Sequence, residues 1–120
     1  MNPAPFEATA AKLDDGVRVI AIRGELDLST AADLEAPLED AVAAGDSSVL
    51  IDLTGCEFID STGIALIVRA WQRLDGADGN GRLVICCPNE QVRRVLEITG
   101  LNLSIPIHDS RDESLAALRS

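Results

Sequence analysis

Aromatic residues are nearly absent from this 120-residue sequence, which has one tryptophan, two phenylalanines and no tyrosine. Phe6, Phe58 and Trp71 cannot fill a core by themselves, so we expect Val, Ile, Leu and Ala to build it. They also offer no row of rings on which single-stranded bases could stack. Hydrophobic residues still make up 47% of the chain, which excludes disorder by composition.

Basic residues are also few. The chain has 10 of them against 20 acidic residues, for a formal net charge of −10. A field of that sign repels a polyanion, and Arg93-Arg94 is the only adjacent basic pair in the sequence. We therefore expect no nucleic-acid partner, whereas a basic protein surface would suit this charge.

Long apolar runs are missing as well. No run approaches the roughly 20 residues that cross a bilayer, and the N-terminus lacks the basic and apolar regions of a secretory signal. We expect a cytoplasmic protein with no membrane partner. The length fits one domain, residues 1–120.

The chain has three cysteines, and none of them belongs to a C-x-x-C pair. Cys56, Cys86 and Cys87 therefore do not predict a zinc site or a thioredoxin-like motif. We expect buried, unpaired thiols in a reducing compartment. No metal or cofactor is predicted.

Apolar runs of strand length alternate with patterns of helical period, and predict the order β-β-α-β-α-β-α-β-α. This is an α/β fold with a mixed, mostly parallel sheet of about five strands and about four helices. The predicted strands are Phe6–Leu13, Val17–Arg23, Ser48–Leu53, Arg82–Cys87 and Leu103–Ile107. The predicted helices begin after Ser29 or Thr30, at about Thr62, at Pro88-Asn89 and after Ser110, and end near Gly45, Leu74, Gly100 and Leu118.

Turn residues separate these elements. Asp14-Asp15-Gly16 predicts a hairpin, so the first two strands should be antiparallel and the later ones parallel. Gly24–Asp27 should end the second strand, and Thr54–Asp60 should be a connecting loop. Pro37 should kink the first helix. The glycine-rich segment Gly76–Gly81 reads as a loop, and it lacks the lysine of a phosphate-binding P-loop.

The turn before the second helix is the strongest candidate site, because partners of α/β sheets meet the carboxyl ends of strands. Ser61 sits just before that helix, where free backbone N–H groups and the positive end of the dipole would tolerate a phosphate. Gly63 would allow a partner to approach the hydroxyl closely. On the residues alone, a plain helix N-cap accounts for Ser61 better than a modification site does.

An enzymatic function is disfavoured. Ser61 is not in a G-x-S-x-G elbow, and the only possible histidine base, His108, is expected in a surface loop. Asp60 with Asp27 or Asp52 matches no metal-binding spacing. We therefore expect no catalytic residues.

Three segments of the sequence form one pattern: Gly24-Glu25-Leu26-Asp27 followed by Thr30, then Ile51-Asp52-Leu53, then Phe58-Ile59-Asp60-Ser61-Thr62-Gly63. Taken together, these segments resemble the STAS domain of bacterial anti-sigma factor antagonists. The resemblance extends over nearly the whole chain, from Phe6 to Leu118.

The resemblance implies a function and partners. Members of this family bind an anti-sigma factor that is also a serine kinase, and so release a sigma factor. That kinase modifies the serine matching Ser61, and a serine phosphatase resets it; ATP and metal belong to those enzymes. By the same match, Asp27 and Asp60 shape an acidic partner-binding surface, while Thr62 and Gly63 position the helix start. Thr62 is the rival acceptor. The alternative within the family is an unphosphorylated scaffold or a transporter's partner module.

Overall fold

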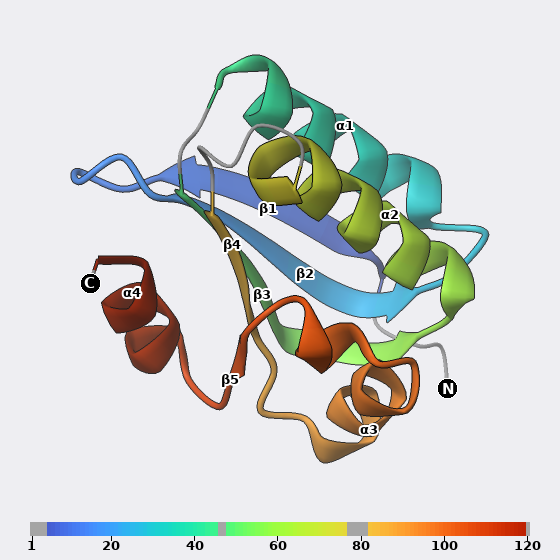
Figure 1. Ribbon diagram of the computed structural model, residues 1–120. Coiled ribbons are helices and arrows are strands. Elements are labelled where there is room, and N and C mark those ends of the chain that lie inside the picture. The colour runs from blue at the N-terminus through green and yellow to red at the C-terminus, as the bar shows by residue number, and fades with distance from the viewer. Residues whose placement is uncertain (1–4, 46–47, 77–81, 120) are drawn as a thin grey trace.

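The computed structural model describes residues 5–45, 48–76 and 82–119. Five strands form one sheet in the order β1-β2-β3-β4-β5 (Figure 1). The strands are β1 (Glu7–Lys12), β2 (Arg18–Leu26), β3 (Ser48–Ile59), β4 (Arg82–Cys86) and β5 (Ile107–His108). The α-helices are α1 (Ala31–Ala43), α2 (Ser61–Trp71), α3 (Glu90–Ile98) and α4 (Arg111–Arg119), with a π-helical turn η1 (Gln72–Gly76) and a 3₁₀ turn η2 (Leu101–Leu103). The predicted order and fold class are confirmed.

The strand directions are also as predicted. β1 and β2 pair antiparallel through the hairpin, whose Gly16 has a φ of 90°, a value that favours glycine. The pairs β2–β3, β3–β4 and β4–β5 are parallel. The carboxyl ends of β2 and β3 therefore lie at the same end of the sheet, which positions the loops that follow them.

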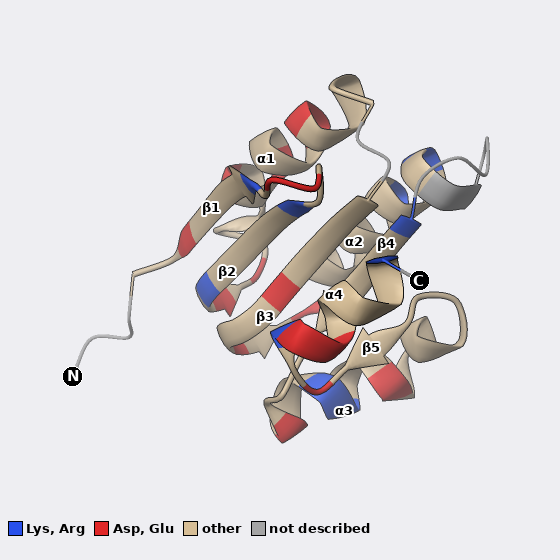
Figure 2. Ribbon diagram, turned by 90° about the vertical axis from the view of Figure 1, so that its left-hand side faces the viewer, with Lys and Arg blue, Asp and Glu red and all other residues tan. Residues whose placement is uncertain are grey.

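The sheet has a core on each face. The larger core lies beneath α1, α2 and α3, and it is aliphatic, as the lack of aromatic residues predicted. The smaller core lies beneath α4, on the opposite face (Figure 2). All three cysteines are buried free thiols, in agreement with the sequence prediction.

An ion pair fixes α4 to the central strand. The side chain of Asp52 on β3 is 8% exposed, and its Oδ2 accepts hydrogen bonds from Arg111 Nε at 3.1 Å and from a terminal guanidinium nitrogen at 2.8 Å. Its Oδ1 accepts the N–H and hydroxyl of Thr54. Burial acts to raise the pKa of Asp52, but the bonds from Thr54 and Arg111 together hold that pKa below its ordinary value of 3.8. Asp52 is therefore a structural carboxylate.

β2 and β3 are longer than predicted. Gly24–Asp27 does not end β2, which runs to Leu26, and Thr54–Asp60 is not a loop, because β3 continues to Ile59. The extra residues pair with each other across a register shift next to Gly24, which has a φ of 89°. A bulge of this kind interrupts the alternation of side chains, and that interruption made the segments read as loops.

The C-terminal region also differs from the prediction. The predicted bounds of the last strand, Leu103–Ile107, are wrong: η2 ends at Leu103, and β5 contains only Ile107 and His108. His108 lies in β5 and is half-buried, so the prediction of a surface loop is wrong too. Its Nε2 is buried and has no hydrogen-bond partner among the described residues.

The helices otherwise follow the sequence. α1 continues through Pro37, and Gly45 follows its end with a φ of 72°, as expected of a helix stop. Asn89 caps α3, and the Ser110 hydroxyl accepts the N–H of Glu113 at the start of α4. Of the predicted loop Gly76–Gly81, residues 77–81 lie outside the described residues.

Candidate functional site

Asp60, and not Ser61, caps α2. Its Oδ1 accepts the N–H of Thr62 at 2.9 Å and the N–H of Gly63 at 3.2 Å, while its backbone is extended. Ser61 is the first residue of the helix itself. The predicted N-cap role of Ser61 is therefore wrong by one residue, because serine and aspartate are both good caps and stand side by side.

The correction leaves the Ser61 hydroxyl available. Ser61 is exposed, and its hydroxyl makes no hydrogen bond to another residue in the described part of the chain. Thr62, the rival acceptor, is half-buried. A side chain that neither caps the helix nor packs in the core is free for chemistry.

The surroundings of that hydroxyl differ from the expectation in one respect. The N–H groups of Thr62 and Gly63, which a phosphate on Ser61 was expected to face, already bind the Asp60 carboxylate. A phosphate on Ser61 would therefore share the helix N-terminus with a second anion. The helix dipole stabilises an anion at this position by about 0.3–1 kcal/mol, and the phosphate would have to share that stabilisation with the Asp60 carboxylate.

Gly63 is needed for packing. A Cβ built there would lie 2.6 Å from Leu26 Cγ and 3.2 Å from Ile59 Cγ1, both on buried side chains. The glycine thus lets the first turn of α2 sit directly on the ends of β2 and β3. This close packing fixes the first turn of α2, which contains Ser61.

The β2–α1 loop is the second part of the site. Asp27 Oδ1 accepts the hydroxyl of Ser29 at 2.6 Å, the N–H of Ser29 at 2.9 Å and the N–H of Thr30 at 3.2 Å. The Ser29 hydroxyl is the main cause of a pKa of Asp27 below its ordinary value, so this carboxyl is charged near neutral pH. The Thr30 hydroxyl in turn donates to the Glu25 carbonyl at 2.8 Å, which closes the loop on β2.

The two parts meet directly. Asp60 Oδ2 accepts the N–H of Leu28 at 3.3 Å, 32 residues away in sequence. In Figure 1 the β2–α1 loop and the start of α2 lie at the same end of the sheet. Asp27 and Asp60 therefore border the same hollow, and Ser61 follows Asp60 in the chain.

An open hollow lies between these loops, and apolar side chains border it. Leu28 is 78% exposed and Phe58 is 47% exposed, high values for such residues. The hollow is lined by Asp27, Leu28, Ser29, Phe58 and Asp60. The sequence analysis did not identify Leu28 or Phe58 as parts of the site. Phe58 could have been noticed, because it is one of only two phenylalanines in the sequence and lies outside the apolar periodicity.

A second hollow adjoins Phe58 on its other side, between the end of β3 and α3. Its lining residues are Glu57, Phe58, Ile59, Gln91, Val92 and Val95. Phe58 thus stands between two depressions. An exposed aromatic ring flanked in this way is typical of a protein-binding surface.

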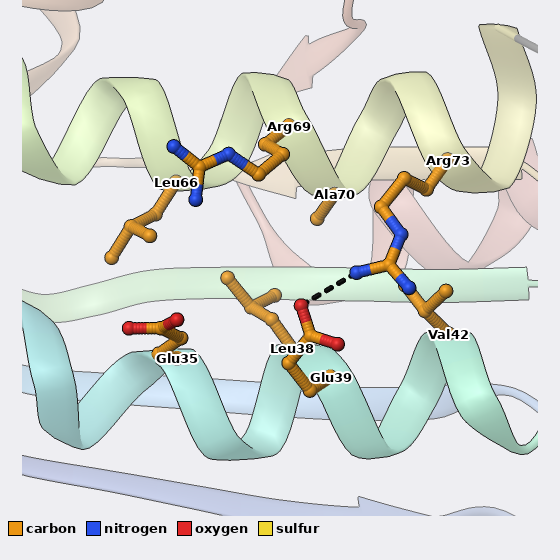
Figure 3. Close-up of a pocket in the computed structure, with 8 residues that line it drawn as sticks. All are labelled: Glu35, Leu38, Glu39, Val42, Leu66, Arg69, Ala70 and Arg73. Carbon is orange, nitrogen blue, oxygen red and sulfur yellow. Dashed lines mark hydrogen bonds and ion pairs between the residues drawn. The ribbon is translucent and has the colours of Figure 1, made fainter.

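A third depression lies between α1 and α2, is smaller than the hollow beside Asp27, and is bridged by an ion pair (Figure 3). Arg73 of η1, the turn that follows α2, forms an ion pair with Glu39 of α1 across it, with the two charged atoms 2.5 Å apart. Leu38 and Leu66 line its floor. These are contacts of interhelical packing, and they do not adjoin Ser61.

The three cysteine thiols lie in buried surroundings that disfavour the thiolate form. Burial is the main cause that raises the pKa of each cysteine, to about 11 for Cys87, so the thiols are protonated near neutral pH. Residues 5–45, 48–76 and 82–119 contain no group of three or more ligands suited to a metal ion. No helix formed by these residues has the length and apolarity to cross a membrane.

Comparison with known proteins identifies the family. A model of the STAS domain matches residues 8–114, and the chain therefore belongs to the STAS domain family. The anti-sigma-F factor antagonist RsfB of Mycobacterium tuberculosis (strain H37Rv) is 28% identical over 117 residues, which cover 97% of this chain and 93% of that protein.

Solved structures agree. The crystal structure of an anti-sigma factor antagonist from Mycobacterium paratuberculosis has a TM-score of 0.83 and 29% identity, and covers 97% of this chain and 96% of that one. The Bacillus cell fate determinant SpoIIAA in its phosphorylated form has a TM-score of 0.71 and 21% identity, over 94% of this chain and 100% of that one. This last likeness shows the fold.

Proposed function

We propose that this protein is an anti-sigma factor antagonist that is switched off by phosphorylation of Ser61. The observation that carries the proposal is that Ser61 is exposed, does not cap α2, and directly follows Asp60, which lines a partly apolar hollow. The relatives named as antagonists support the same function.

The surface around Ser61 sets the chemistry of the partner. Leu28 and Phe58 supply apolar contact area, and the carboxylates of Asp27 and Asp60 border the same hollow. A complementary partner presents an apolar side chain to the hollow and basic residues around it. With a net charge of −10, the chain as a whole attracts such a surface.

Phosphorylation changes this surface without unfolding it. A phosphate adds about −1.5 to −2 charges and three acceptor oxygens. On Ser61 these charges stand next to the Asp60 carboxylate and in the path of an apolar partner. Binding then requires desolvation of a dianion, while the core beneath α2 is untouched.

The partners follow from this mechanism. We infer an anti-sigma factor with serine-kinase activity as the binding partner, and a serine phosphatase that restores the hydroxyl. The nucleotide and metal reside in those enzymes, and the exchange takes place in the cytoplasm. The antagonist itself contributes the acceptor hydroxyl and the surface that presents it.

Phosphosite mapping tests the proposal. The protein is incubated with ATP and each anti-sigma kinase encoded in the same genome, and the modified residue is located by mass spectrometry. We expect one phosphate, on Ser61, and none in Ser61→Ala; Thr62→Val is the matched control and should be modified normally. A kinase that binds the protein and leaves Ser61 unmodified would favour the scaffold or transporter-partner alternative.

A further inference from the structure

Asp60 and Asn89 are side-chain N-caps of different chemistry. Asn89 caps α3 through Oδ1, which accepts the N–H of Gln91 at 2.9 Å, and its Nδ2 donates to the Cys56 carbonyl at 3.3 Å. Asp60 caps α2 in the same way, but its second atom accepts the N–H of Leu28. Each cap therefore also ties its helix to another segment, and the tie at α2 is made by a charged oxygen.

The Asp60 tie is the weakest of the three bonds made by that carboxylate. Its N···O distance is 3.3 Å, against 2.9 Å to Thr62 and 3.2 Å to Gly63, and the bond lies in exposed surroundings. Leu28 belongs to the loop 27–30, whose other hydrogen bonds join residues 25–33 to one another. The backbone N–H of Asp60 also donates to the Leu26 carbonyl at 3.2 Å, which fixes the end of β2 but not Leu28 itself. If the carboxylate turns, the bond to Leu28 breaks first.

Ser61 is covalently next to this carboxylate. A phosphate there adds a dianion at a helix end whose second and third N–H groups are already bound to Asp60. Two anions that compete for the same donors repel each other. We expect the longest and most exposed hydrogen bond of Asp60, the one from the Leu28 N–H, to break.

We propose that Asp60 is a positioning residue that couples the phosphorylation state of Ser61 to the loop that carries Leu28. With a free hydroxyl at Ser61, the Asp60 carboxylate holds the Leu28 N–H and thereby keeps the exposed leucine at the edge of the hollow. With a phosphate on Ser61, Asp60 releases that N–H and the apolar contact loses its fixed position. This inference rests on the proposed function, because it presupposes that Ser61 is phosphorylated. It adds a second cause for the loss of partner binding.

Amide hydrogen exchange at Leu28 tests the coupling without a kinase or a partner. Phosphoserine is incorporated at position 61 during translation, and exchange is followed by NMR in the modified and unmodified proteins. We expect the Leu28 amide to exchange about fivefold faster or more in the phosphoserine form, as a lost hydrogen bond allows. The Gln91 amide, held by Asn89, is the internal control and should not change.

The variant Asp60→Asn separates coupling from capping. Its Oδ1 still caps Thr62 and Gly63, but its amide nitrogen cannot accept the Leu28 N–H. We expect fast Leu28 exchange in this variant whether or not phosphoserine is present. Equal exchange in modified and unmodified wild-type protein would overturn the coupling, and so would an equal acceleration by phosphoserine in Asp60→Asn. The wild-type comparison decides even if the variant does not fold.

The outcomes also separate this coupling from the proposed function. Loss of partner binding in the phosphoserine form with unchanged Leu28 exchange would refute the coupling and leave the proposed function standing. Faster Leu28 exchange with unchanged partner binding would refute the proposed switch and leave the coupling standing.

Discussion

Replacement of Gly63 by alanine tests how tightly α2 is seated on the sheet. The new Cβ would lie 2.6 Å from Leu26 Cγ and 2.8 Å from Leu26 Cδ2, about 1 Å closer than ordinary van der Waals contact. Both partners of the overlap are buried, so neither can move into solvent. Overpacking of this kind costs roughly 1–3 kcal/mol, and the better helix propensity of alanine returns less than about 1 kcal/mol. We expect a net loss of about 1–2 kcal/mol.

Gly55→Ala is the matched control. A Cβ there would lie 2.8 Å from Arg23 Cγ, a similar overlap, but Arg23 is exposed and its side chain can rotate away. We expect a change within about 0.5 kcal/mol.

Urea unfolding followed by the fluorescence of Trp71, the only tryptophan, measures both variants. A loss of 1–2 kcal/mol lowers the Gly63→Ala midpoint by roughly 0.5–1 M at an unchanged slope. The reasoning is refuted if Gly63→Ala unfolds at the wild-type midpoint, or if Gly55→Ala loses as much stability as Gly63→Ala.

Three further predictions concern stability. Asn89→Asp should lower the melting temperature, because its second carboxylate oxygen would face the Cys56 carbonyl in place of an N–H donor, at a cost of roughly 1–3 kcal/mol; an unchanged melt contradicts this. The folded-state pKa of Asp52 is lowered, so its contribution to stability is complete above the unfolded value near 3.8 and is lost as the pH falls through the folded pKa. Arg111→Met removes the ion pair and should reduce that acid-dependent loss of stability, measured by urea titrations between pH 5 and pH 2. Ser61→Ala should change the free energy of unfolding by less than about 0.5 kcal/mol, since Ser61 is not the cap, whereas a loss near 1 kcal/mol would mean that it is.

Much of the fold could be predicted from the pattern of apolar residues. The run Val49-Leu50-Ile51 identified a strand covered on both faces, and Asp14-Asp15-Gly16 identified the antiparallel hairpin. In each case local sequence and tertiary packing favour the same structure. Elements for which the two agree can be predicted from the sequence.

The ends of β2 and β3 could not be predicted because their pairing is non-local. Thr54, Gly55 and Glu57 are polar or flexible, and they lie in a strand only because β2 runs beside them across a bulge. A bulge breaks the period of two on which strand prediction depends. Both β2 and β3 therefore appeared shorter in the sequence than they are.

The start of α2 was predicted from the sequence, but the residue that caps it was not. The sequence located Ser61 at the start of a helix, but Asp60 and Ser61 are both capping residues, and only backbone geometry decides between them. The bond from Leu28 to Asp60 joins segments 32 residues apart, so no local pattern could reveal it. The exposure of Leu28 could not be predicted either, because burial depends on the packing of the whole chain.

The affinity for the cognate anti-sigma factor is the most direct test of the proposed switch. It should be measured by titration calorimetry for the unmodified protein and for the protein with phosphoserine at position 61, with Ser61→Ala as the uncharged control. Desolvation of a dianion against an apolar partner side chain costs several kcal/mol, so we predict a loss of at least about 100-fold with phosphoserine and near wild-type affinity with alanine. Equal affinity of the phosphorylated and unmodified proteins would contradict the account.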